Sequence, residues 1–136
     1  MADETNARTG VPGLDDILGG GLARGRLFLL EGEPGAGKTT IAMRFLIEGA
    51  DEGEPGLYIT LSETADELRA AAASHGWTLD PAKLDILEVI PPESLLDADQ
   101  QQSLLYSSDL ELGETTRLIF DEFEKRNPAR VVLDSL

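Results

Sequence analysis

The chain has 136 residues, about the length of one domain, and 41% of them are hydrophobic, which is enough for a sizeable core. Its 26 acidic and 11 basic residues leave a formal net charge of −15. Because affinity for nucleic acid depends largely on clustered cations, this charge and the scattered lysines and arginines argue against a nucleic-acid partner. The absence of cysteine excludes disulfides and thiolate metal sites, and it suits a reducing compartment.

The sequence carries no recognisable targeting segment. The first ten residues, MADETNARTG, lack the apolar stretch of a secretory signal, and no run reaches the roughly eighteen apolar residues of a membrane span. We therefore expect a soluble cytoplasmic protein without a membrane partner. Residues 1–8 are polar and are expected to form a flexible lead into the domain.

Residues 9–25 predict a loop-rich approach to the first strand. Pro12-Gly13 has turn chemistry, residues 14–18 fit one or two helical turns, and three consecutive glycines end them. Residues 26–31, RLFLLE, then form a short apolar run, which predicts a strand buried on both faces.

The next eight residues, GEPGAGKT, fill every position of the phosphate-binding pattern G-x-x-x-x-G-K-[ST], and an apolar helical pattern follows from Thr40. Glycines in such a loop let successive N–H groups turn toward phosphate oxygens, and the positive end of the helix dipole adds to the attraction. Lys38 would bring its charge to the β- and γ-phosphates, and the Thr39 hydroxyl would bind Mg²⁺. The residues predicted to bind nucleotide are Gly32, Glu33, Pro34, Gly35, Ala36, Gly37, Lys38, Thr39 and Thr40.

Thr40, the last of these residues, is a candidate for an indirect role at the nucleotide site only. The alternative interpretation is a glycine-rich turn between strand and helix that happens to spell the pattern, but the correct flanks on both sides favour a phosphate site.

A longer run, TGVPGLDDILGGGLARGRLFLLEGEPGAGKTTIAMRFL, resembles the opening of a KaiC-type ATPase domain, in the RecA-like branch of the P-loop NTPases. The lead-in T-G-x-x-x-L-D-x-x-L-x-G-G-x is itself characteristic of that branch. A phosphate loop alone would not separate kinases, GTPases and RecA-like ATPases. The similarity continues along nearly the whole chain.

Residues 57–61 have strand composition, and a helix is expected from about Thr64 to Ser74. Glu63 stands between them, where parallel sheets bind ligands, so it is a candidate to orient water against a γ-phosphate. The alternative is an acid that only offsets the helix dipole. KaiC-like domains typically carry two adjacent glutamates here, whereas this chain has Ser62-Glu63. Glu63 matches the second member, and either it acts as the base or hydrolysis is slow.

The C-terminal third predicts a strand at residues 84–90, a long excursion over residues 93–113 with at most a short helical turn, and an amphipathic helix at residues 114–126. The excursion could face a neighbouring subunit or be a disordered surface loop. Residues 130–135, RVVLDS, resemble the family's Walker B strand. The resemblance implies that Asp134 holds Mg²⁺ through a water molecule, together with Thr39.

The predicted fold is an α/β three-layer sandwich with a mainly parallel sheet, a RecA-like P-loop NTPase core. The resemblance implies an ATPase that binds ATP or ADP with Mg²⁺, uses Lys38 and Glu63 in catalysis, and signals by conformational change in a hexameric ring with protein partners. The family includes autokinases, but their acceptor residues lie beyond this chain. One alternative is a DNA-repair ATPase of the recombinase type, which the missing basic surface opposes. Another is a nucleotide-sensing module with little turnover, which Ser62 favours.

The resemblance also carries an expectation about the end of the chain. In the RecA-like branch the strand after Walker B lies between the P-loop strand and the Walker B strand, and residue 136 comes before it. We therefore expect residues 1–136 to be the N-terminal portion of one domain, with residues 9–136 as a core that ends at Walker B. The remaining strands and any trans-acting arginine would lie downstream.

Overall fold

The computed structural model describes residues 5–89 and 101–134, apart from the side chains of residues 101–112 and 115. The chain divides into two compact units, one formed by residues 1–88 and 128–136 and the other by residues 89–127. The first unit contains every predicted site residue.

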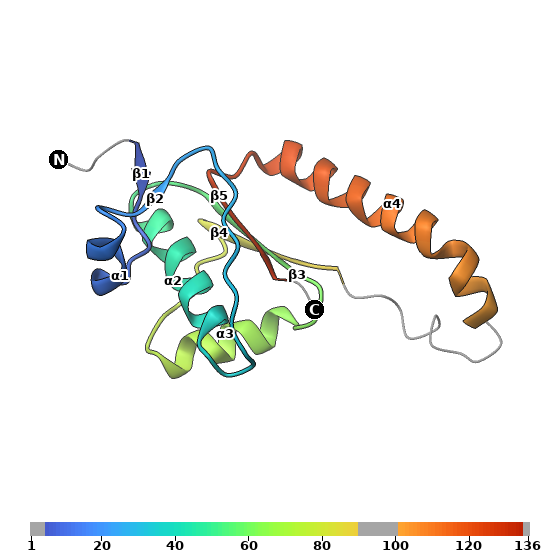
Figure 1. The fold of residues 1–136 in the computed structure, drawn as a ribbon, viewed down its shortest axis with the longest axis horizontal. Coiled ribbons are helices and arrows are strands. Elements are labelled where there is room, and N and C mark those ends of the chain that lie inside the picture. Colours follow the sequence, from blue (N-terminus) through green and yellow to red (C-terminus); the bar gives the residue numbers. More distant parts are fainter. Residues whose placement is uncertain (1–4, 90–100, 135–136) are drawn as a thin grey trace. The chain divides into compact units, whose positions relative to one another are not determined.

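A parallel three-stranded sheet forms the centre of the first unit (Figure 1). Strand β3 (Gly56–Thr60) lies between β4 (Leu84–Glu88) and β5 (Arg130–Asp134), and all five of its residues are buried, as expected for a strand with neighbours on both sides. The register places Thr60 beside Asp134, so these residues share the carboxyl-terminal edge. The predicted α/β class, the parallel sheet and its three strands at residues 57, 84 and 130 onward are confirmed, while Ile90 and Ser135 lie outside the described residues.

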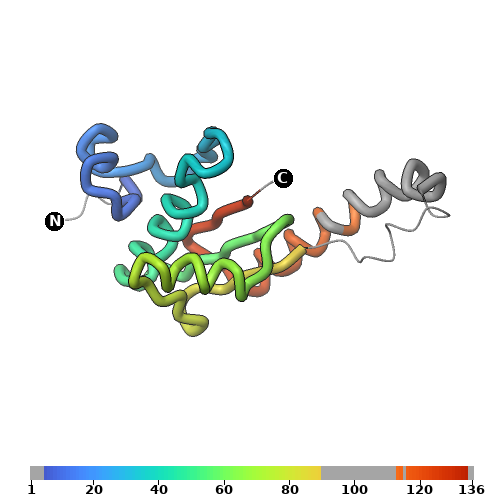
Figure 2. The backbone as a smooth tube through the Cα atoms, turned by 90° about the horizontal axis from the view of Figure 1, so that it is seen from below, coloured from blue at the N-terminus to red at the C-terminus, as the bar shows by residue number. Residues whose placement is uncertain are grey.

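Two helices pack against the sheet beside β3 and β4, as Figures 1 and 2 show. Helix α2 (Lys38–Asp51) and helix α3 (Ala65–Ser74) bury apolar side chains at spacings of three or four residues, as amphipathic helices do. They share one core with β3 and β4, made by Met43, Leu46, Tyr58, Leu68, Ala72, Leu79 and Leu84.

The ends of α3 agree with the sequence prediction. Thr64 caps the helix, since its side chain accepts a hydrogen bond from the Glu67 N–H at 3.1 Å. Gly76 follows the last turn with φ of +76°, a left-handed conformation that glycine adopts without strain.

The N-terminal segment is more ordered than the predicted flexible lead. Strand β1 (Asn6–Ala7) pairs antiparallel with β2 (Leu22–Ala23), and the short helix α1 (Pro12–Ile17) lies between them in sequence. A Cβ at Gly21 would lie 2.2 Å from the Ala7 carbonyl oxygen, so glycine permits the close backbone approach of this pair.

The strand predicted at residues 26–31 is wrong: these residues form a coil between β2 and α2, drawn without an arrow in Figure 1. Leu27 is 98% exposed and Leu29 is 82% exposed. In the described part of the chain no strand pairs with this segment. Because a strand is held by hydrogen bonds to a neighbour, the apolar composition of this run is not sufficient to make it one.

The second unit contains helix α4 (Gln101–Arg126), which corrects the prediction of a helix that starts only at residue 114. Thirteen more residues join the helix, because this run holds four leucines and two glutamines, whose helix propensities offset the cost of Gly113. Of the predicted excursion, residues 93–100 lie outside the described residues. Within the described ranges, no helix combines the length and the apolar character needed to cross a membrane.

Candidate functional site

The predicted phosphate loop ends at the first residue of α2. Gly37 precedes the helix with φ of +99°, a conformation that favours glycine, and no side chain caps the helix at this position. Gly35 is also left-handed, with φ of +87°. The N–H groups at the start of a helix lack intrahelical partners, so an uncapped start that follows a glycine loop can receive an anion.

Lys38 is turned back over the loop that precedes it. Its Nζ donates a hydrogen bond to the carbonyl oxygen of Gly32. A Cβ at Gly32 would lie 3.2 Å from the Cβ of Ala36, which is tight, and 3.5 Å from the Lys38 side chain, which is ordinary contact. The Lys38 side chain therefore lies against the first residue of its own loop.

Tyr58 contacts one of the predicted metal-binding residues and lies near another, and sequence analysis did not identify it. Its hydroxyl donates to Oδ2 of Asp134 at 2.7 Å. Burial, then the bond to Asp134 and the charge of that carboxylate, raise the pKa of Tyr58 well above its ordinary range, and the nearby Thr39 side chain offsets this only in part. The available signal was an aromatic residue with a polar tip in a strand that leads to the site.

Glu63 lies in a turn that Thr60 holds in place. The buried Thr60 hydroxyl donates to the Glu63 carbonyl oxygen at 3.0 Å and accepts from the Glu63 N–H at 2.9 Å. Burial raises the pKa of the Glu63 carboxyl, and the negative charges of Asp134 and Glu67 raise it further. The negative charge of Asp134 therefore acts on the Glu63 carboxyl. The neighbouring Ser62 is exposed.

The oxygen donors at this site suit Mg²⁺ bound together with phosphate. Thr39, Asp134 and Glu63 offer a hydroxyl and two carboxylates, the hard ligands that magnesium prefers. Among the described residues, no group of three or more His, Cys, Asp or Glu side chains could hold a metal ion by itself. Magnesium commonly takes one or two protein carboxylates and completes its shell with water and substrate phosphates, so this donor set fits.

Thr40 faces the end of α3. Its hydroxyl lies 3.4 Å from Nε2 of His75, and the His75 ring stacks on Trp77 with centroids 4.8 Å apart. Trp77 in turn packs against the core cluster, so it anchors the chain after α3. The indirect role predicted for Thr40 stays a prediction.

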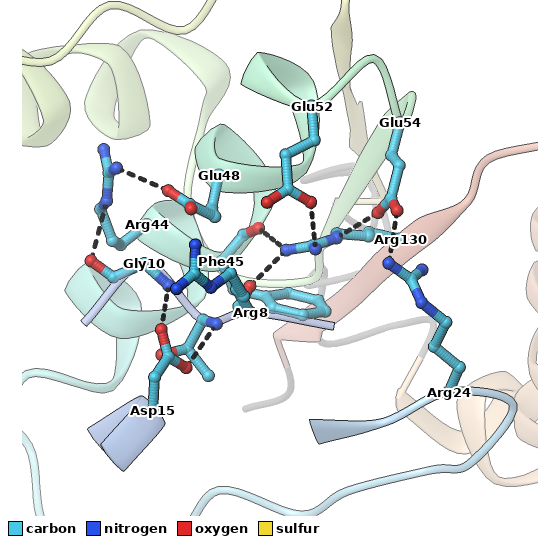
Figure 3. Close-up of polar contacts among 11 residues, drawn as sticks. Arg8, Gly10, Asp15, Arg24, Arg44, Phe45, Glu48, Glu52, Glu54 and Arg130 are labelled. Carbon is cyan, nitrogen blue, oxygen red and sulfur yellow. Dashed lines mark hydrogen bonds and ion pairs between the residues drawn. The ribbon is translucent and has the colours of Figure 1, made fainter. Parts of the chain in front are cut away.

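Arg130, at the start of β5, is buried and joins several parts of the first unit (Figure 3). Its guanidinium donates to Glu54 at 2.7 Å, to the Arg8 carbonyl oxygen at 2.6 Å and to the Phe45 carbonyl oxygen at 2.8 Å. It also lies over the Phe45 ring, 4.7 Å from the centroid. This residue holds the strand that ends in Asp134 against α2, and sequence analysis missed it because its partners are distant in the chain.

Comparison with known proteins agrees with this geometry. The family model for the KaiC ATPase matches residues 7–136. The chain is 29% identical over 133 residues to a UPF0273 protein of Thermotoga maritima, covering 95% of this chain and 54% of that protein. It is 43% identical over 74 residues to a UPF0273 protein of Pyrococcus horikoshii, covering 54% of this chain and 30% of the relative.

A third relative is the circadian clock oscillator protein KaiC of Thermosynechococcus vestitus, which is 35% identical over 133 residues, covering 94% of this chain and 24% of the relative. The chain thus spans about half the length of the Thermotoga protein and less of the other two. Because the family match extends over nearly all of residues 1–136, together with the phosphate loop, the parallel sheet and Asp134 at the end of β5, the chain belongs to the KaiC ATPase family.

Proposed function

We propose that the chain binds ATP with Mg²⁺ and hydrolyses it at the site formed by the phosphate loop, Glu63 and Asp134. The observation that carries this proposal is the grouping around Asp134: its carboxylate accepts a hydrogen bond from Tyr58, and its charge raises the pKa of Glu63. The Thr39 side chain lies near the same tyrosine. These residues come from α2, β3, β5 and the turn after β3, so they share one edge of the sheet. Ligands of parallel sheets bind at this edge.

Each residue has a defined task in this reaction. The loop N–H groups and the Lys38 ammonium hold the β- and γ-phosphates, which keeps the reacting phosphorus in position. Thr39 and Asp134 would hold Mg²⁺, which when bound would supply positive charge against the phosphates. Glu63 accepts a proton from, or orients, the attacking water. Its raised pKa makes it a stronger base than an exposed glutamate. Phosphoryl transfer needs little more from a protein than such positioning and charge.

We further propose that hydrolysis drives a conformational change in a homo-oligomeric, hexameric ring, which is then read by protein partners. Support comes from membership of the KaiC ATPase family. Two relatives are named as circadian clock proteins, one from Synechocystis and one from Thermosynechococcus, so a signalling output is a reasonable extension to this chain. Native mass spectrometry of the full-length protein with ATP, and without nucleotide, measures the number of subunits directly.

The experiment that tests ATP turnover is phosphate release by the purified full-length protein with ATP and Mg²⁺, run beside a nucleotide-binding titration. We expect saturable ATP binding and phosphate release that stops when EDTA removes the metal. No binding would overturn the proposal as a whole.

A second candidate is a nucleotide-sensing module that binds ATP with little turnover. The observation that favours it is Ser62, which stands where the family typically has the first of two glutamates and which is exposed beside Glu63. Binding without phosphate release in the experiment above would select this candidate.

A further inference from the structure

The Tyr58 hydroxyl contacts Asp134, one of the two residues proposed to hold magnesium, although its ring belongs to the hydrophobic core. In the register of the sheet Tyr58 pairs with Val132, and Asp134 lies two residues further along β5 on the same face. The diagonal placement brings the Tyr58 hydroxyl to 2.7 Å from Oδ2 of Asp134. The tyrosine is 1% exposed and packs in the cluster that includes Met43 and Leu68, so core packing constrains its ring.

The Thr39 side chain, in the first turn of α2, lies near the same hydroxyl. A carboxylate that accepts a proton donor from one side keeps its remaining lone pairs and has a fixed orientation. The hydrogen bond from Tyr58 therefore fixes the orientation of the Asp134 carboxylate and leaves its other lone pairs for the ion.

We propose that Tyr58 is a positioning residue that holds the Asp134 carboxylate in the orientation needed to bind Mg²⁺ with nucleotide. The inference rests on the proposed function, because Tyr58 would orient a ligand of the Mg²⁺ site proposed there. Mutation of a group that hydrogen-bonds to a metal ligand and orients it commonly lowers the affinity for the metal. A core tyrosine whose hydroxyl is merely satisfied would instead affect stability alone.

The test is Tyr58→Phe in the full-length protein, which removes the hydroxyl and keeps the ring. ATP binding is measured by calorimetry at increasing Mg²⁺ and again with EDTA. We expect the Mg²⁺ concentration for half-maximal enhancement of ATP binding to rise about tenfold, while the metal-free affinity for ATP stays unchanged. The matched control is Thr9→Val, which removes a buried hydroxyl that donates to Asp15 at 2.8 Å in the N-terminal segment. It should lower stability and leave the Mg²⁺ dependence as in the wild type.

The outcomes separate the inference from the function on which it rests. A wild type that binds no ATP overturns the proposed function and this inference with it. If the wild type binds ATP and Tyr58→Phe shows the same Mg²⁺ dependence, the positioning role is wrong and the proposed function stands.

A second measurement keeps the inference testable if Tyr58→Phe does not fold. The sequence has two tyrosines, so the Tyr106→Phe variant leaves Tyr58 as the single tyrosine ring signal in a selectively labelled NMR spectrum. We expect that signal to shift on adding Mg²⁺ to the ADP-bound protein and to return on adding EDTA. A signal that does not respond to the metal would overturn the positioning role.

Discussion

The side chain of Arg130 occupies the space that a side chain at residue 49 would need. A Cβ at Gly49 would lie 2.4 Å from Cδ and 2.7 Å from Nε of Arg130. Because the guanidinium is buried and bonded to Glu54 and to two backbone carbonyl groups, it cannot move aside without breaking those bonds. The glycine in the last turns of α2 is therefore what allows the helix to pack against β5.

Gly49→Ala should destabilise the protein by about 1–3 kcal/mol, the usual cost of overpacking a core. The sign of this change in stability is informative, because alanine in a helix interior is intrinsically favoured over glycine by about 1 kcal/mol. Urea unfolding followed by circular dichroism measures the difference. Gly13→Ala in α1 is the control, because a Cβ there meets nothing within 4 Å. A Gly49→Ala variant as stable as Gly13→Ala would show that Arg130 can be displaced at little cost.

Replacing Lys38 by Ala should weaken Mg-ATP binding at least tenfold, about 1.4 kcal/mol, because it removes the positive charge that faces the β- and γ-phosphates. Lys83→Ala, which removes a lysine from the turn before β4, should bind as the wild type does. A nucleotide-binding titration measures both. A folded Lys38→Ala variant with unchanged affinity would refute the assignment of the phosphate loop.

Glu63→Gln should slow ATP hydrolysis by roughly a hundredfold while ATP still binds, because the amide cannot accept the proton of water. Asp66→Asn, also in the first turn of α3 and exposed to solvent, is the matched control and should keep its rate. Equal rates of phosphate release by Glu63→Gln and the wild type would show that Glu63 is a surface acid without a catalytic role. Ser62→Glu, which restores the pair typical of the family, would then also have little effect.

The pH dependence of hydrolysis offers a separate test of Glu63. A base must be deprotonated to act, so activity should rise with pH through the pKa of Glu63. Burial and the nearby charge of Asp134 raise that pKa, so the acidic limb of the rate profile should lie above the ordinary range of glutamate. Rate measurements across the acidic range would contradict this if the limb fell at the position of an exposed glutamate.

Asp15 should make the free energy of unfolding depend on pH in the acidic range. Burial alone would raise the pKa of its carboxyl, but hydrogen bonds from Thr9 and Gly10 outweigh burial and lower the pKa below its ordinary value. Since the folded pKa lies below the unfolded one, the contribution is complete above the unfolded pKa of about 3.9 and is lost as pH falls through the folded pKa. The free energies of unfolding of the wild type and of Asp15→Asn should therefore differ at neutral pH and become similar in strong acid. A difference that stayed constant with pH would contradict the account.

The exposed apolar segment before the phosphate loop should make the 136-residue chain associate or remain marginally stable when it is expressed alone. Among the described residues, no strand pairs with residues 27–30 or with the edge of β5 away from β3, and Leu133 in β5 is exposed. Such strand-forming surfaces pair with other chains. Light scattering after gel filtration should show less association for Leu27→Lys/Leu29→Lys, and no change for Ile17→Lys in α1. A wild-type monomer with a cooperative melt and normal ATP turnover would contradict this expectation.

Much of the first unit could be predicted from short-range patterns. The start of α2 after Gly37, the Thr64 cap and Gly76 stop of α3, and the strand that ends in Asp134 each depend on residues a few positions apart. Hydrogen bonds and steric limits within one turn act at that range, so the residues themselves carry the signal. The phosphate loop was identified for the same reason.

The tertiary structure decided the features that depend on distant partners. Tyr58 meets Asp134, and Arg130 meets Glu54, across 76 positions in each case, and no local pattern records such a contact. Residues 26–31 have the composition of a strand yet form a coil, because a strand requires hydrogen bonds from a neighbour that its own side chains cannot supply. Sequence alone therefore determined where nucleotide chemistry is expected, whereas the packing of β3 against β5 decided that Tyr58 contacts Asp134 there.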